Sequence, residues 1–143
     1  MAAVNADISQ RTARPAAGWV SLLARLALVS PFLLSAVLKA ADFAAATAEV
    51  QGLTGLEPAG LIAALVIATQ FGGSLLLLFG GGRAWIGAGL LAGFTIVATL
   101  LAHAWWSKPA PEAARDLMVF WEHVAICGGL LLAGWLSWRE PAR

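Results

Sequence analysis

The sequence has few charged residues and a single cysteine. Only 12% of its 143 residues are Asp, Glu, Lys or Arg, against about 25% in soluble domains. Cys127 has no partner for a disulfide within the chain, so cysteine usage does not indicate a redox compartment. The net charge is +1 and the basic residues form no cluster, which argues against a nucleic-acid partner.

The sequence motifs of several well-known catalytic sites are also missing. The chain has no phosphate-binding loop, no dinucleotide-binding glycine motif and no nucleophile elbow. Its two histidines occur without H-x-x-E-x-x-H or C-x-x-C spacing, so we predict no metal site. Haem is not expected either, because both histidines lie near the same end of the apolar stretches. We therefore do not expect the chain to be catalytic alone.

Apolar residues dominate instead and make up 60% of the chain. They form four stretches, over residues 19–41, 58–81, 84–106 and 117–138. Each has the ~20 residues that a helix needs to cross ~30 Å of hydrocarbon, and none shows the polar stripe of a soluble core helix. We predict an all-α integral membrane four-helix bundle, with one domain over residues 18–140 after a flexible tail over residues 1–17.

Tryptophans mark both ends of these stretches. Trp19, Trp85, Trp135 and Trp138 fall at one set of ends, and Trp105, Trp106 and Trp121 at the other. An apolar ring with one N–H prefers the headgroup level of a membrane. Six of the nine basic residues lie on the side of the termini. Because cytoplasmic loops are rich in Lys and Arg, we predict a cell inner membrane protein with both termini in the cytoplasm.

The connections between the stretches are short. Residues 42–57 predict a short helix that ends at Gly52 and lies flat on the outer membrane surface. The three glycines at residues 80–82 predict a tight turn, and residues 107–115, with two prolines, predict a second outer loop.

Small residues recur where helices would pack. We expect close helix contacts at Gly72, Gly73, Gly89, Gly93, Gly128 and Gly129. Small side chains let two backbones approach in lipid, where no hydrophobic force drives helices together. Association of two chains through Gly89 and Gly93 is the alternative, which would give a homo-oligomer. Gln70 lies near mid-membrane and is expected to make an interhelical hydrogen bond.

Ionisable side chains gather near the outer ends of the stretches. Lys39 ends the first stretch, His103 ends the third, and Glu122 and His123 lie within the fourth. Ionisable groups in a bilayer are costly and therefore indicate function. These four are our candidate catalytic residues.

The types of these residues suit proton transfer to or from a quinone. Trp105, Trp106, Trp121 and His103 are the candidate walls of a quinone pocket. The structural alternative has Lys39 reaching the headgroups or pairing with Glu122. Arg25, near the other side, is expected to reach headgroups or a lipid phosphate.

Four short motifs resemble the DoxX family of small four-helix membrane proteins. They are S-A-V-L-K-A-A-D-F at residues 35–43, Q-F-G-G-S-L-L-L-L-F-G at 70–80 followed by Arg83 and Ala84, H-A-W at 103–105, and V-A-I-C-G-G-L-L-L at 124–132. The family usually has Glu where Gln70 stands, so a proton role of that acid does not carry over. It usually has a basic or amide pair where Glu122 and His123 stand.

The resemblance implies a membrane redox accessory, because the family takes its name from a subunit associated with quinone-linked sulfur oxidation. We therefore predict a membrane subunit that anchors other membrane or periplasmic redox subunits in the lipid bilayer. No covalent cofactor is expected, and quinone is the candidate ligand. A small-solute transporter and a purely structural subunit stay open as alternatives.

Overall fold

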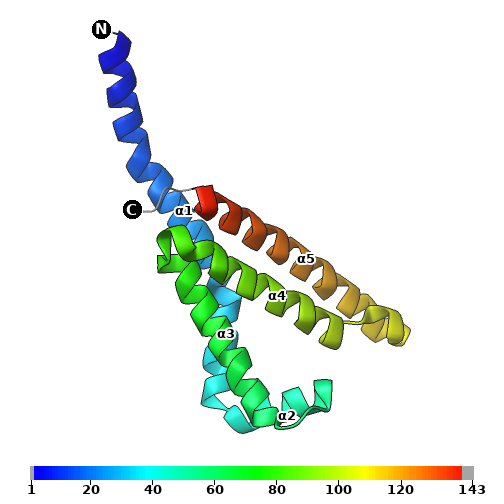
Figure 1. The fold of residues 1–143 in the computed structure, drawn as a ribbon. Helices are drawn as coiled ribbons and strands as arrows, with labels where there is room; N and C mark the ends of the chain where they lie inside the picture. The colour runs from blue at the N-terminus through cyan, green and yellow to red at the C-terminus, as the bar shows by residue number, and fades with distance from the viewer. Residues whose placement is uncertain (1, 140–143) are drawn as a thin grey trace.

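The computed structural model describes residues 2–139, and the side chains of residues 18–139. Its α-helices are α1 (Ala2–Ala41), α2 (Phe43–Thr54), α3 (Ala59–Phe79), α4 (Ala84–Ala102) and α5 (Ala110–Arg139) (Figure 1). Two short 3₁₀ turns, η1 (Gly81–Arg83) and η2 (Trp105–Ser107), precede α4 and α5. This described part contains no β-strand, which confirms the predicted all-α fold class.

Four segments are long and apolar enough to span a membrane. They are Gly18–Ala41, Ala59–Phe79, Gly81–Ser107 and Ala110–Arg139. Large apolar side chains on their outward surfaces, such as Trp19, Leu34 and Leu131, are exposed, as lipid-facing residues are in the absence of lipid. The prediction of four membrane-length apolar helices is thereby confirmed, and the chain is a multi-pass membrane protein.

Two helix boundaries differ from the sequence prediction. The structure makes residues 2–17 the beginning of α1, which extends beyond the other helices (Figure 1). The division of the chain at residue 17 stays a prediction. α5 begins at Ala110, so the expected second outer loop is shorter. Proline is compatible with a first helical turn, and an acid is favourable there, which explains why Pro111 and Glu112 can occupy the first turn of this helix.

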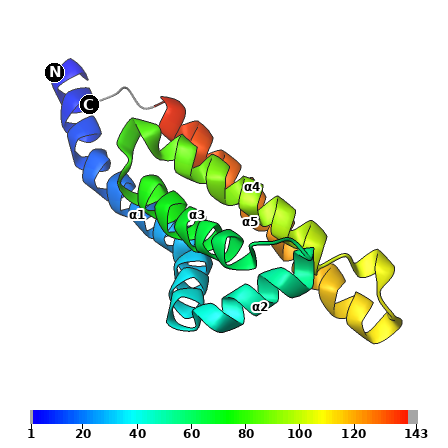
Figure 2. The same ribbon diagram turned by 60° about the horizontal axis from the view of Figure 1, so that its bottom comes forward.

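The helix α2 lies at the end of the bundle away from the beginning of α1 and the end of α5 (Figure 2). The Asp42 carboxylate accepts a hydrogen bond from the Ala45 backbone N–H at 2.9 Å and caps its first turn. The helix passes Gly52 and stops at Gly55, which has a φ of 64°. A glycine within a helix costs only ~1 kcal/mol, whereas the left-handed Gly55 provides a true stop.

The membrane helices pack most closely near η1. The buried apolar core of the bundle consists of Val29, Phe32, Leu77, Ala84, Ala88, Leu91, Ala92 and Leu130. A β-carbon on Gly87 would overlap the backbone oxygen of Gly73, and one on Gly73 would lie 2.9 Å from the Leu91 Cγ. The helices α3 and α4 therefore touch through their backbones at this end. They diverge toward the other end, which we call the η2 end (Figure 1).

The six glycines predicted to pack helices divide into two groups. Gly73 packs against α4, and a β-carbon on Gly129 would lie 3.1 Å from Leu28. A β-carbon on Gly72, Gly89, Gly93 or Gly128 would meet nothing within 4 Å. These last four do not make the predicted contacts within the chain, because the helices turn other faces toward one another. Gly87, which the prediction omitted, has the role in α4 that Gly89 was expected to have.

Arg25 turns into the bundle near η1. Its Nη1 donates to the Leu77 carbonyl and its Nη2 to the Ser137 hydroxyl, both at 3.2 Å. The Leu77 carbonyl belongs to the last turn of α3, where carbonyls lack a partner within the helix and the helix dipole attracts a cation. Arg25 thus joins α1, α3 and α5. The sequence prediction, that Arg25 reaches headgroups or a lipid phosphate, did not include these hydrogen bonds to internal acceptors.

Candidate functional site

A cavity of about 540 Å³ lies between the helices at the η2 end. Residues of all five α-helices line it, and α2 forms the wall nearest the end of the bundle. Most of the lining is apolar; its polar members are Ser35, Lys39, Glu49, Thr54, Gln70, Thr95, His103 and His123. Its volume falls within the range of about 300–1,000 Å³ that small-molecule sites occupy.

Gln70 links the α3 and α1 walls of the cavity through a hydrogen bond. It is 3% exposed, and its Nε2 donates to the Ser35 hydroxyl of α1 at 3.1 Å. This is the interhelical hydrogen bond that an amide at this depth needs. The Oε1 atom of Gln70 is buried and has no hydrogen-bond partner among residues 18–139.

The two histidines meet at one side of the cavity. His103 directly follows α4, and His123 belongs to α5. Their ring centroids are 5.3 Å apart and the ring planes cross at 69°. Both rings line the cavity. The structure therefore brings together the two imidazoles that the sequence analysis placed in one polar cluster.

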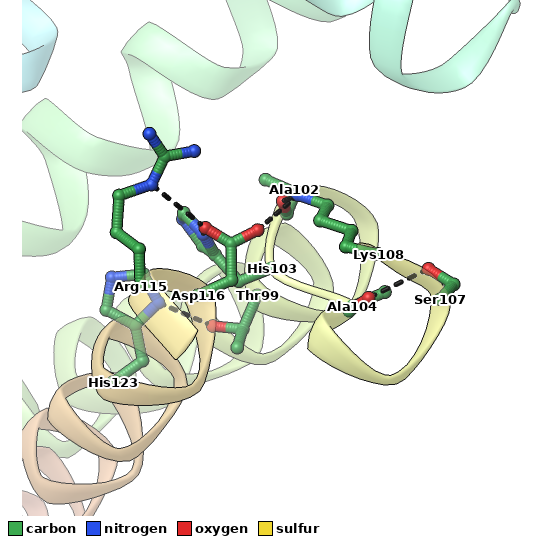
Figure 3. A network of polar contacts seen from close by, with 9 residues as sticks. All are labelled: Thr99, Ala102, His103, Ala104, Ser107, Lys108, Arg115, Asp116 and His123. Carbon is green, nitrogen blue, oxygen red and sulfur yellow. Dashed lines mark hydrogen bonds and ion pairs between the residues drawn. The ribbon is translucent and has the colours of Figure 1, made fainter. Parts of the chain in front are cut away.

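His123 is held by a hydroxyl of the neighbouring helix α4. Its Nδ1 lies 2.8 Å from the Thr99 Oγ1 (Figure 3). The Thr99 hydroxyl in turn donates to the Thr95 carbonyl at 2.5 Å, and Thr99 is 5% exposed. The orientation of the His123 ring is thus determined by a buried chain of hydrogen bonds.

His103 stands next to a buried carboxylate. Asp116 of α5 is 2% exposed, and one of its oxygens lies 3.5 Å from both the His103 Nδ1 and the Arg115 Nε. Its other oxygen forms an ion pair with Lys108 (Figure 3). The His103 Nδ1 makes no hydrogen bond with a described residue, so the contact with Asp116 is electrostatic.

Lys108 connects this network to the end of α4. Its Nζ donates to the Ala102 carbonyl at 2.7 Å as well as pairing with Asp116. Sequence reasoning missed Lys108, Asp116 and Thr99. Pro111 is the sequence feature that could have predicted Asp116 as part of the site. Because proline is compatible with a first helical turn, it allows α5 to begin near residue 110 and so to include Asp116.

Lys39 and Glu122 do not pair with each other. Lys39 forms an ion pair with Glu49 of α2 and lines the cavity. Glu122 is exposed and does not line it. Neighbouring residues of a helix point about 100° apart, so His123 faces the cavity and Glu122 faces away. The predicted cluster of four therefore contributes three side chains to the cavity.

The tryptophans predicted to wall a quinone pocket lie elsewhere. Trp105, Trp106 and Trp121 are not among the lining residues. Trp106 and Trp121 are more than half exposed and both contact Phe120 edge to face, with centroids 6.1 and 5.8 Å away. An indole keeps its N–H at the membrane surface, which accounts for this position. The aromatic walls of the cavity are Phe32 and Phe94, 6.4 Å apart.

Metal ligands do not gather at this site. Within residues 18–139, no three His, Cys, Asp or Glu side chains come together as a metal ion would require. What the arrangement offers is an apolar chamber with two adjacent imidazoles, which can bind a flat apolar molecule and exchange a proton with it.

A comparison with family models matches residues 20–104 to DoxX. The matched range contains the membrane part of α1 and all of α2, α3 and α4, together with His103. The motif of α5 at residues 124–132 lies outside it. No curated protein and no solved structure matches the chain. Because the family match covers more than half of the 143 residues, this chain belongs to the DoxX family.

Proposed function

We propose that this chain is a membrane subunit of a quinone-linked redox complex, located in the cell inner membrane with both termini in the cytoplasm. It anchors a membrane or periplasmic redox protein and holds the ring of a quinone in the cavity at the η2 end. One observation carries this proposal: the cavity of about 540 Å³ has an apolar lining and an imidazole pair at one side.

The residues of the cavity fit a quinone ring. Phe32, Phe94 and Ile126 offer apolar surfaces to its faces, and a small number of placed polar groups is typical of ligand sites. A bound quinone supplies reversible electron and proton chemistry, for which the redox partner is the electron source or acceptor. The part of this chain is to bind the ring, exclude water from it and hold a proton at His123 or His103.

The location of the cavity supports a partner on the periplasmic side. The cavity is lined by α2, which lies at the end of the bundle opposite the beginning of α1 and the end of α5 (Figure 2). With cytoplasmic termini, that end faces the periplasm, and α2 and η2 are the elements that a docked redox protein would meet. Transport is the weaker alternative, since Leu77 and Leu91 are fully buried and close the bundle near η1.

The test is gentle purification from native membranes, with mass spectrometry of the attached proteins and analysis of extracted quinone. We expect a stoichiometric redox enzyme and quinone in the extract. His123→Gln should lower the summed content of quinone and quinol in the extract, and quinone-dependent electron transfer, about tenfold, the effect of losing one good hydrogen bond to the ligand. Glu122→Gln is the matched control, because the neighbouring Glu122 faces away from the cavity.

Two outcomes would contradict the proposal. A chain that purifies without a redox partner and without quinone would reject the complex and favour a structural or transport role. Equal quinone content in both variants would reject the cavity as the quinone site, whatever partner is attached.

A further inference from the structure

The hydrogen bonds of Thr99 determine which nitrogen of His123 carries the proton. A threonine hydroxyl has a single proton to donate. The Thr99 Oγ1 lies 2.5 Å from the Thr95 carbonyl oxygen, and a carbonyl can only accept, so the proton is used there. The contact of 2.8 Å between Thr99 Oγ1 and His123 Nδ1 therefore needs a proton from the ring. Neutral His123 is the tautomer protonated on Nδ1.

This tautomer leaves the second ring nitrogen as an acceptor. In a neutral imidazole with a proton on Nδ1, Nε2 offers only a lone pair. The His123 Nε2 makes no hydrogen bond with any described residue. The ring lines the cavity, and its second nitrogen points away from Thr99 (Figure 3). His123 thus offers a lone pair without a partner among the described residues, on a ring that lines the cavity.

The side of the cavity that carries the imidazoles presents acceptors. The Thr95 hydroxyl there donates to the Leu91 carbonyl, whereas the N–H groups of Lys39 and Gln70 belong to α1 and α3 and also bond Glu49 and Ser35. The Asp116 carboxylate, 3.5 Å from the His103 Nδ1, favours a proton on that nitrogen and so a lone pair on the other nitrogen of neutral His103. On the side of the imidazoles, a ligand with only carbonyl oxygens would therefore face lone pairs.

We propose that the cavity selects a ligand that donates a hydrogen bond from an aromatic hydroxyl to the His123 Nε2. This inference rests on the proposed quinone function and specifies it further: the site prefers the quinol to the quinone. A quinol hydroxyl donates to Nε2, whereas a quinone carbonyl meets it as a second acceptor. Thr99 is a positioning residue, since it acts by holding the tautomer of His123.

The binding test uses the full chain in lipid nanodiscs. A decyl-substituted benzoquinone and its quinol, which share ring and tail, are titrated separately. We expect the quinol to bind about tenfold more tightly, because the quinone leaves the acceptor unpaired. Thr99→Val keeps the shape of the side chain but no longer favours one tautomer of His123, so the preference for the quinol over the quinone should fall to about threefold or less. Thr47→Val is the control, since the Thr47 hydroxyl bonds the Phe43 carbonyl in α2 and does not line the cavity.

A spectroscopic test reports on the tautomer itself. The ¹⁵N chemical shifts of the His123 ring, assigned by comparison with His123→Gln, distinguish a protonated Nδ1 from a protonated Nε2. We expect a protonated Nδ1 in the unmodified protein at a pH where the ring is neutral, and a mixture in Thr99→Val. If Thr99 served only to pack α4 against α5, the Thr99→Val substitution would leave these chemical shifts unchanged.

The outcomes separate the two proposals. If neither probe binds, the quinone function itself is rejected. If both bind equally, or the quinone binds more tightly, the quinone site stands and the selection for a donor is overturned. A protonated Nε2 in the unmodified protein also overturns it. The unmodified chain gives both results, so they do not depend on the folding of Thr99→Val.

Discussion

Gly87 of α4 lies so close to Gly73 of α3 that a β-carbon on Gly87 would overlap the Gly73 carbonyl oxygen. Without side chains between them, the two backbones come into direct contact, as small residues allow in membrane helices. This contact lies near η1, whereas the cavity lies between the same helices at the η2 end. The pair therefore sets the point from which α3 and α4 diverge.

Replacing Gly87 should destabilise the bundle. In Gly87→Ala the added methyl group would overlap the Gly73 carbonyl, and overpacking of this kind costs about 1–3 kcal/mol. Thermal unfolding in detergent measures the effect. Gly89→Ala is the control, since a β-carbon there meets nothing within 4 Å and the intrinsic helix propensity changes equally. Equal unfolding temperatures for the two variants would contradict a backbone contact at Gly87.

Removing the Arg25 guanidinium should loosen α1. Arg25→Met keeps a long apolar stem but loses the hydrogen bonds to Leu77 and Ser137, and hydrogen bonds to charged groups contribute about 1.5–3 kcal/mol. We expect a lower unfolding temperature and faster proteolysis of the N-terminal helix. Arg83→Met changes an exposed arginine at the same end of the bundle. Similar losses in both variants would show that net charge, and not these hydrogen bonds, is responsible.

The pairing of Asp116 with Lys108 should stabilise the connection between α4 and α5. Asp116→Asn removes a carboxylate that is 2% exposed and that pairs with Lys108, so the variant should unfold at a lower temperature. Its effect is measured by unfolding, alone and combined with Lys108→Met. We expect the double variant to lose less than the sum of the two single losses, which is the mark of direct coupling. Glu112→Gln, on the exposed first turn of α5, should change stability by less than about 0.5 kcal/mol.

Cysteine labelling should locate the two ends of the bundle. In a Cys127→Ser background, Ser107→Cys places a thiol in η2, and Gly82→Cys places one in η1. With both termini in the cytoplasm, a membrane-impermeant maleimide should label Ser107→Cys in intact spheroplasts and Gly82→Cys only after permeabilisation. The reverse pattern would place the termini and η1 outside, and would move the cavity to the cytoplasmic side.

Residue order alone determined the membrane-spanning architecture. The thickness of the hydrocarbon sets the length of an apolar helix, so composition and tryptophan positions suffice to predict four spans. Local chemistry also determined the start of α2, because the Asp42 carboxylate satisfies a free backbone N–H of its first turn. These features need no knowledge of which helix contacts which.

The tertiary structure decided which face of each helix points inward. Gly87, and not Gly89, makes the contact with α3. His123 lines the cavity, whereas Glu122 does not. Lys39 pairs with Glu49 and not with Glu122. In a soluble helix the apolar stripe reveals the buried face. In a bilayer, lipid tails are as apolar as the protein core, so both faces carry the same residues and only packing distinguishes them.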